Sequence, residues 1–256
     1  MSRLKGLFEK KKHRVLNVYC TAGFPGPEST MDVMESLQQA GADIIELGMP
    51  YSDPLADGPV IQASGSKALE NGMTIEKLFT QLKNFRSRIN LPVILMGYMN
   101  PVLQYGFEKF CIDASSLGVD GVILPDLPMV EFESEYGPIL RKYALDFIFL
   151  VTPETDRERI IKLDELSSGF LYAVSSSSTT GNDKDLREQL TYFKTLQELQ
   201  LKNPVLIGFG IKDKLSFDTA CKYARGAIIG SAYIRAIENS SDINRSTHQF
   251  LQSVLS

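Results

Sequence analysis

Short apolar runs alternate with amphipathic segments along the whole chain. The runs are rich in Val, Ile and Leu, which is typical of strands buried on both faces of a parallel sheet. Between them, apolar residues recur three and four positions apart, as at Val33, Leu37 and Ala40, and this spacing predicts helices with one buried face. We expect eight strands, at residues 16–20, 44–47, 93–96, 121–124, 147–151, 170–174, 205–208 and 227–229.

A helix is predicted after each of these strands, and one more before the first, where Leu4, Leu7 and Phe8 share a face. The stretch from Gly97 to Leu103 is expected to be an apolar loop instead. The other helices are expected at residues 29–40, 61–70, 74–89, 107–117, 132–143, 155–166, 184–199, 215–223, from 231 onward, and at 243–255.

Eight repeats of strand and helix within 256 residues predict an α/β fold, a (β/α)8 TIM barrel with an extra N-terminal helix. An open, doubly wound sheet is the alternative, but it usually carries its glycine-rich turn after the first strand. Here the glycine-rich turns follow the seventh and eighth strands, which favours the barrel. With no linker or repeat, residues 1–256 are expected to form one domain.

Composition and charge exclude several functions. The chain is 43% hydrophobic with a net charge of −4, so nucleic acid is not an expected partner. The basic cluster Lys10–Arg14 is interpreted as a solvated helix end. No apolar run is long enough for a signal peptide or a membrane span, and the three separated cysteines are interpreted as reduced core thiols: Cys20, Cys111 and Cys221. These features favour a cytoplasmic protein without a membrane partner.

Neither metal chemistry nor a histidine-based triad is indicated. The two histidines, His13 and His248, lie near opposite ends of the chain, and no metal-ligand spacing appears. No lysine lies at a strand end in a position suited to a Schiff base, which weakens that type of aldolase mechanism. Carboxylates are therefore the main candidates for catalysis.

Glu46 lies inside a buried strand, where a carboxylate is costly unless it has a partner or a function. The following loop, rich in Gly, Pro and Asp, brings Asp57 toward the same strand end. Two carboxylates whose environments separate their pKa values can divide proton transfer between them. Asp53, which precedes Pro54 in the loop, competes for this role but is more typical of a turn or an interface.

Gly208-Phe209-Gly210 follows the seventh strand, and Gly230-Ser231 follows the eighth. Glycine turns let backbone N–H groups approach an anion, and this pair of positions is where many barrels bind phosphate. Ser231 either adds a hydroxyl donor or caps a helix. The small, polar loop from Ser175 to Gly181 is interpreted as a lid, with a solvated connection as the alternative.

The segment Ile45-Glu-Leu-Gly-Met-Pro-Tyr-Ser-Asp-Pro-Leu-Ala-Asp-Gly58 closely resembles the signature of the tryptophan synthase alpha chain family. Shorter motifs in the same order extend the resemblance over nearly the whole chain: Thr21-Ala-Gly-Phe-Pro, Met96-Gly-Tyr-Met-Asn-Pro, Pro125-Asp-Leu-Pro, Tyr172-Ala-Val-Ser, Gly208-Phe-Gly-Ile and Gly230-Ser-Ala. The resemblance implies a lyase that splits indole-3-glycerol phosphate into indole and glyceraldehyde 3-phosphate.

The resemblance also implies residue roles. Glu46 matches the acid–base residue that protonates the indole ring carbon and helps to deprotonate the glycerol hydroxyl. Asp57 matches the carboxylate that binds the indole N–H. The implied pocket wall for the indole is Tyr19, Ile61, Met96 and Tyr172; the implied phosphate and lid positions are Thr180, Gly181, Phe209, Gly210, Gly230 and Ser231.

By the same resemblance, the partner is a tryptophan synthase beta chain that receives the indole, in an α2β2 heterotetramer. Pro50, Asp53 and Asn100 match the surface that faces it. Pyridoxal phosphate is expected in the beta chain alone, and no cofactor here. One departure is that the lid holds Ser178 where the family has glycine, and lacks the usual arginine. Two alternatives stay open: another phosphate-binding barrel enzyme, and a catalytically weak chain that binds phosphate ligands and activates a beta chain.

Overall fold

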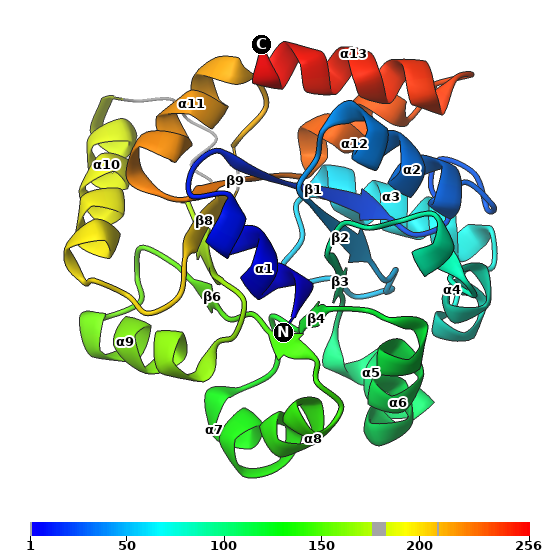
Figure 1. Cartoon of the computed structure of the whole chain (residues 1–256), viewed down its shortest axis with the longest axis horizontal. Helices are drawn as coiled ribbons and strands as arrows, with labels where there is room; N and C mark the ends of the chain where they lie inside the picture. Colours follow the sequence, from blue (N-terminus) through cyan, green and yellow to red (C-terminus); the bar gives the residue numbers. More distant parts are fainter. Residues whose placement is uncertain (1, 176–182, 209) are drawn as a thin grey trace.

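A ring of parallel strands surrounded by helices forms the body of the molecule (Figure 1). The computed structural model describes residues 2–175, 183–208 and 210–256. Its strands are β1 (Val15–Thr21), β2 (Ile44–Gly48), β3 (Val93–Met96), β4 (Gly121–Ile123), β5 (Asp146–Phe147), β6 (Leu150–Val151), β7 (Leu171–Val174), β8 (Val205–Gly208) and β9 (Gly226–Ile229).

The ring closes through β5 and β6, which are two pieces of one extended segment. The strand order is β5-β4-β3-β2-β1-β9-β8-β7-β6, so the two ends of the sheet are neighbours in the chain. Between them, the Ile148 amide donates to Val122 on one side, and the Phe149 carbonyl accepts from Tyr172 on the other. The nine strand pieces are therefore the eight strands of a closed barrel, as the sequence predicts.

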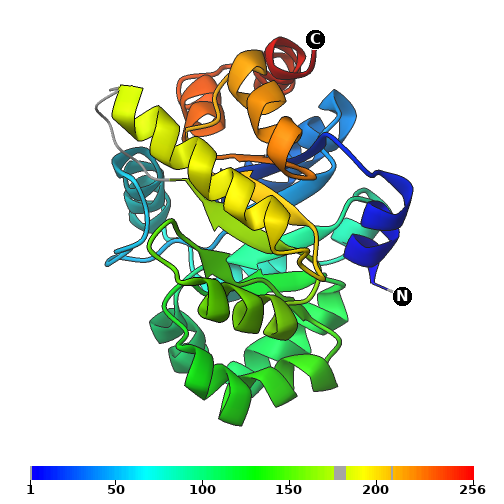
Figure 2. The same ribbon diagram turned by 90° about the vertical axis from the view of Figure 1, so that its left-hand side faces the viewer.

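Helices cover the outside of this wall. Figure 2 shows the covering layer from the side, with α9 and α10 in front of the strands. The α-helices are α1 (Arg3–Lys10), α2 (Thr30–Ala40), α3 (Pro59–Glu70), α4 (Ile75–Gln81), α5 (Met99–Tyr105), α6 (Phe107–Leu117), α7 (Met129–Glu131), α8 (Gly137–Lys142), α9 (Arg157–Leu166), α10 (Asp183–Glu198), α11 (Lys214–Tyr223), α12 (Ser231–Ile237) and α13 (Ile243–Leu255).

Three of the predicted segments need correction. The expected apolar loop at Gly97–Leu103 is largely helix α5, with Met99 and Val102 buried. Pro101 is tolerated because it lies in the first turn, where backbone N–H groups have no partner within the helix. The helix expected at residues 74–89 ends at Gln81, and a 3-10 turn (Phe85–Ser87) follows Asn84, whose φ of 62° lies in the left-handed region.

A π-helical turn also interrupts the helix expected at residues 132–143. The chain there forms α7, a π turn (Phe132–Tyr136) and then α8. The bulky ring of Phe132 packs inward against Phe147 and Phe149, with ring centroids 4.7 and 4.9 Å away. None of these local differences changes the alternation of strand and helix.

Strand residues alternate between the barrel interior and the helical layer, which is why the core has two parts. Val15 belongs to the interior cluster, whereas Leu16 and Val18 belong to the cluster between strands and helices. The interior cluster is filled mainly by β-branched and aromatic side chains: Val15, Ile44, Ile94, Ile123, Ile148, Phe170, Tyr172, Leu206 and Ile228.

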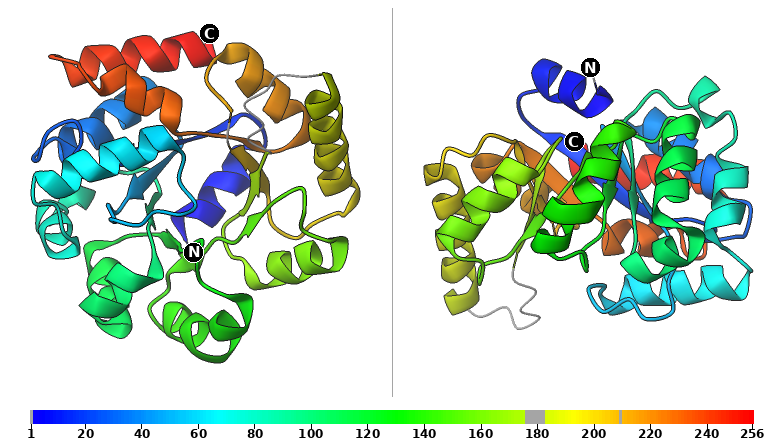
Figure 3. Two further views of the ribbon diagram at one scale, coloured as in Figure 1. Left: turned by 180° about the vertical axis from the view of Figure 1, so that it is seen from behind. Right: turned by 90° about the horizontal axis from the view of Figure 1, so that it is seen from below.

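The extra helix α1 closes the amino end of the barrel. Leu4 and Phe8 pack against the interior cluster, and the rings of Phe8 and Phe170 lie 6.2 Å apart. Arg3 pairs with Asp120 at the start of β4, at 3.0 Å. Figure 3 shows α1 at one end of the molecule and α3 toward the other. The carboxyl ends of the strands are thus the open end, where a barrel enzyme places its site.

Candidate active site

Glu46 lies in the interior of the barrel on β2, next to Tyr19 of β1 in the strand register. Its side chain is 1% exposed, and its Oε2 atom accepts a 2.7 Å hydrogen bond from Nδ2 of Asn17. Burial raises the pKa of Glu46 to about 8, although the bond from Asn17 favours the ionised form; the charge of Asp57 raises the pKa further. Glu46 is thus poised to hold or release a proton near neutral pH.

Asp57 is the second carboxyl group of this site. It lies on the loop between β2 and α3, where it is partly buried beside Tyr98. Burial raises the pKa of Asp57 to about 6, and the hydrogen bond from the Tyr98 hydroxyl opposes this rise. The Tyr98 oxygen also accepts a 3.0 Å bond from the Ala56 amide, which fixes the loop next to Asp57. The two carboxyl groups therefore differ in pKa, as a division of acid and base roles requires.

Both carboxyl groups line one cavity of about 160 Å³ at the carboxyl end of the strands. This cavity brings together all the described residues that the resemblance assigns to catalysis or to the substrate. Its lining is Tyr19, Glu46, Asp57, Ile61, Met96, Tyr172, Gly210, Ile211, Lys212, Ile228, Gly230, Ser231, Ala232 and Arg235. Thr180, Gly181 and Phe209 lie outside the described residues, as does the predicted lid apart from Ser175.

Two tyrosines form much of the apolar wall, and each is accommodated by a glycine on the neighbouring strand. A Cβ atom on Gly48 would lie 2.0 Å from the Tyr19 hydroxyl, and one on Gly208 would lie 2.4 Å from the Tyr172 hydroxyl. Both tyrosines are at least nine-tenths buried. A side chain at either glycine would displace a ring from the cavity wall.

The glycine turns after β8 and β9 meet on the other side of the cavity. Gly210 and Gly230 both line it, and Gly230 is the N-cap of α12, so Ser231 begins that helix. Lys212 and Arg235 line the same side, and neither forms an ion pair within the described part of the chain. Backbone amides and two cations make this side of the cavity suited to an anion.

The residues assigned to a partner surface do not enter the cavity. Asp53 and Asn100 are exposed; Asp53 accepts a hydrogen bond from Ser52, and Asn100 donates to the Tyr51 hydroxyl at 3.0 Å. Pro50, three residues before Asp53 in the sequence, is half-buried. Asp53 is therefore placed outside the site, and Asp57 alone joins Glu46 in it.

Sequence reasoning missed three contributors to this site. Asn17 is a polar residue within an apolar strand, which is the same signal that identified Glu46. Lys212 and Arg235 follow the two glycine turns, but their sequence positions alone do not indicate that they share one cavity. Asp126, which follows β4, does not line the cavity: both of its carboxylate oxygens lie 3.0 Å from the amide nitrogen of Met99, the first residue of α5.

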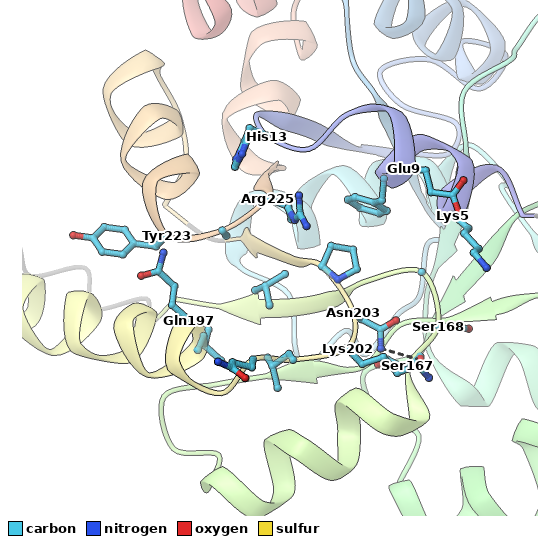
Figure 4. Close-up of a pocket in the computed structure, with 18 of the residues that line it drawn as sticks. Lys5, Glu9, His13, Ser167, Ser168, Gln197, Lys202, Asn203, Tyr223 and Arg225 are labelled. Carbon is cyan, nitrogen blue, oxygen red and sulfur yellow. Dashed lines mark hydrogen bonds between the residues drawn. The ribbon is translucent and has the colours of Figure 1, made fainter.

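A larger hollow of about 730 Å³ lies at the opposite, amino end of the barrel, beside α1 (Figure 4). Lys5, Glu9 and His13 border it on one side, and Lys202 and Arg225 on others. It holds neither Glu46 nor Asp57, and α1 and the barrel interior separate it from them. Size alone therefore does not identify the active site.

In residues 2–175, 183–208 and 210–256, no group of three or more His, Cys, Asp or Glu side chains is placed to hold a metal ion. The three cysteines are free thiols, and Cys20 and Cys111 are buried as predicted, whereas Cys221 is half-buried. No helix of the described chain is long and apolar enough to cross a membrane.

Fold and site together define a class: a (β/α)8 barrel protein with two carboxyl groups of raised pKa and a recess suited to an anion in one cavity at the carboxyl end of its strands. Comparisons with known proteins identify the family. The family model described as tryptophan synthase alpha chain matches residues 6–255. The chain therefore belongs to the tryptophan synthase alpha chain family, and it is a lyase of tryptophan biosynthesis that cleaves indole-3-glycerol phosphate.

Individual relatives agree with this assignment. The tryptophan synthase alpha chain of Christiangramia forsetii is 49% identical over 236 residues, 92% of each chain. That of Flavobacterium johnsoniae is 48% identical over 241 residues, 94% of this chain and 95% of the relative. The crystal structure of tryptophan synthase subunit alpha from Legionella pneumophila matches with a TM-score of 0.88 and 35% identity, covering 99% of this chain and 97% of the other.

Proposed function

We propose that Glu46 and Asp57 carry out the cleavage of indole-3-glycerol phosphate to indole and glyceraldehyde 3-phosphate. The observation that carries this proposal is their placement: both line one cavity, and both have a pKa raised by burial, to about 8 and about 6. At neutral pH the buried Glu46 holds a proton, and Asp57 is ionised. This is the combination needed to donate a proton to a ring carbon while stabilising positive charge nearby.

The chemistry is a retro-aldol reaction. Glu46 delivers its proton to the indole carbon that bears the glycerol chain, and this places positive charge on the ring. Asp57 accepts a hydrogen bond from the ring N–H and stabilises that charge. The glycerol hydroxyl then loses its proton to the Glu46 carboxylate, its oxygen forms the aldehyde, and the electrons of the breaking C–C bond restore the aromatic ring. Glu46 ends the reaction protonated, as it began.

The remaining cavity residues position the substrate. Its indole fits the apolar side, with Tyr19, Ile61, Met96 and Tyr172, and its phosphate fits the side with the glycine turns. Lys212 and Arg235 add positive charge there. The full phosphate and lid set that we propose is Thr180, Gly181, Phe209, Gly210, Gly230 and Ser231.

The test compares Glu46→Gln and Asp57→Asn with Asp53→Asn as the matched control, because Asp53 is an exposed carboxylate of the same loop. We expect Glu46→Gln to abolish indole release while glyceraldehyde 3-phosphate still binds, and Asp57→Asn to slow release by about a hundredfold or more. Asp53→Asn should retain normal turnover in the chain alone. Near-normal turnover of Glu46→Gln would refute the assigned role, and an Asp53 effect larger than that of Asp57 would reassign the second acid.

We also propose the partnership that the family implies: a beta chain in an α2β2 assembly, located in the cytoplasm, with pyridoxal phosphate in the beta chain and no cofactor in this one. Pro50, Asp53 and Asn100 would face the beta chain. The nearby Leu55 and Leu103 support an interface there, since they are 95% and 48% exposed.

Indole release should be measured with the chain alone and again with a beta chain added. Slow release that accelerates on addition of beta would support both the lyase site and the partnership. No release in either case, with phosphate ligand still bound, would favour the alternative: a catalytically weak partner that activates a beta chain.

A further inference from the structure

Asn17 lies in an unusual position for a polar side chain. It is fully buried in the barrel interior, and in the strand register it is level with Ile44 of β2 and Ile228 of β9. The interior side chains around this level are apolar. Asn17 therefore lies in an apolar layer on the amino-end side of Glu46. A carboxamide in such a place costs free energy unless its hydrogen bonds are made.

Only half of the Asn17 side chain is satisfied. Its Nδ2 atom donates a 2.7 Å bond to Oε2 of Glu46, whereas its buried Oδ1 atom has no hydrogen-bond partner among the residues that the structure describes. A buried carbonyl oxygen without a hydrogen bond loses its solvation by water and gains nothing in return, so it destabilises the fold. Oδ1 and Nδ2 belong to the same terminal amide, and a rotation of 180° about the Cβ–Cγ bond exchanges their positions.

Glu46 needs different partners at different stages of the reaction. As a carboxylate it needs a donor, and as a carboxylic acid it presents an O–H group that needs an acceptor. An amide side chain supplies both from one position, whereas a hydrophobic residue supplies neither and a carboxylate cannot donate to another carboxylate. We propose that Asn17 is a positioning residue that holds Glu46 in both protonation states, through Nδ2 when Glu46 is ionised and through Oδ1 when it is protonated.

This inference rests on the proposed role of Glu46. Asn17 differs from the other polar groups near that carboxyl group because its side chain does not ionise. The ionisable groups that interact electrostatically with Glu46 are Asp57, Tyr19, Tyr172 and Cys20. Burial raises the pKa of all four, and Asn17 is the neighbour whose hydrogen bond lowers the pKa of Glu46. Removing Asn17 should therefore shift the Glu46 titration to higher pH, because the ionised form loses its donor.

The test uses Asn17→Leu, an apolar side chain of similar size, and Asn17→Asp, a close isostere that keeps acceptors but brings a second carboxyl group beside Glu46. Thr247→Val is the matched control: Thr247 is also fully buried, but it bonds the Tyr233 hydroxyl in a distant helix pair. We expect both Asn17 variants to lower kcat by about tenfold or more, with the alkaline limb of the kcat profile moved to higher pH. Thr247→Val should lose stability without moving that limb.

Infrared spectroscopy gives a readout that a purely structural role would not change. The C=O band of protonated Glu46, identified by its disappearance in Glu46→Gln, should move to higher frequency in Asn17→Leu because its partner is gone. An unmoved band together with a wild-type pH limb would overturn the inference; if Asn17→Leu does not fold, the same two outcomes decide it in Asn17→Ala, which also lacks both the donor and the acceptor. Turnover by Glu46→Gln itself would instead defeat the proposed function, so the two failures are separable.

Discussion

The Tyr19 hydroxyl lies directly against Gly48: a Cβ atom built on residue 48 would come within 2.0 Å of the Tyr19 oxygen. The two residues are on paired strands, and Tyr19 itself is level with Glu46 in the register. Residue 48 has to be glycine for this arrangement, because the place of a Cβ atom is taken by the Tyr19 ring, which forms one wall of the cavity. A one-carbon change at residue 48 should act on the site through this ring.

Gly48→Ala is expected to displace the Tyr19 ring and to lower kcat/KM by about 10–100-fold, since small errors in positioning are costly for catalysis. The matched control is Gly6→Ala in helix α1, where no atom of the described residues outside the immediate chain and helix backbone lies within 4 Å of the added Cβ atom. That control should keep full activity and gain slightly in stability, because alanine is the better helix former. Steady-state kinetics of indole release check both; normal kcat/KM in Gly48→Ala would show that the ring adapts freely.

The activity of the wild-type chain should depend on pH with two limbs. The productive form has Asp57 ionised and Glu46 protonated, and their pKa values are about 6 and about 8. Activity should therefore rise as pH increases through the Asp57 value and fall as pH increases through the Glu46 value. A profile of kcat/KM between pH 5 and pH 10 tests this ordering.

Asp57→Asn is the control for that profile, since it should remove the acid limb from whatever activity remains and leave the alkaline limb. A wild-type profile that keeps rising well beyond pH 9 would contradict the protonated state assigned to Glu46.

Tyr98→Phe should slow turnover although both carboxyl groups, Glu46 and Asp57, are kept. The Tyr98 hydroxyl accepts from the Ala56 amide and donates to Asp57, so its loss frees the loop and removes a bond that favours ionised Asp57. We expect about tenfold slower turnover and an acid limb moved to higher pH. Tyr105→Phe is the control, because the hydroxyl of Tyr105 bonds the surface side chains of Lys109 and Asp113. Equal effects of the two substitutions would show that the Tyr98 bond has no specific role.

Stability should depend strongly on Asp120, which joins four elements. Its carboxylate accepts from the Val93 amide at 2.8 Å and pairs with Arg3 and Arg86. Its side chain is 4% exposed, so removal leaves the partly buried Arg86 without its counter-charge. Asp120→Ala is expected to lower the free energy of unfolding by about 3–5 kcal/mol. Urea unfolding measures this loss.

Asp113→Ala, which breaks a surface pair with Lys109, is the matched control, and its cost should stay within about 1 kcal/mol. Similar losses for the two variants would mean that burial of the Asp120 network adds nothing.

Local sequence patterns were sufficient to predict the barrel. Buried parallel strands are continuous apolar runs, so the segments such as 93–96 and 205–208 were located to the residue. The bounds of the strand that closes the barrel were harder to predict, because this strand pairs with β4 in its first part and with β7 in its second. Helix α5 was missed because apolar residues around Pro101 resemble a loop, and only the fold brings Asp126 to accept a hydrogen bond from the first backbone amide of the helix.

Some features of this protein are patterns of neighbouring residues: apolar runs that alternate with amphipathic segments, an acidic residue within one strand, and glycines after two strands. These patterns are enough to predict the barrel and to single out Glu46 and the glycine turns. The residues that surround Glu46 could not be predicted in this way. Asn17, Asp57 and the cations Lys212 and Arg235 come from separate segments, and their meeting in or beside one cavity depends on strand register and on closure of the ring. Long-range pairing therefore decides which side chains lie together at the cavity, because no local period carries that information.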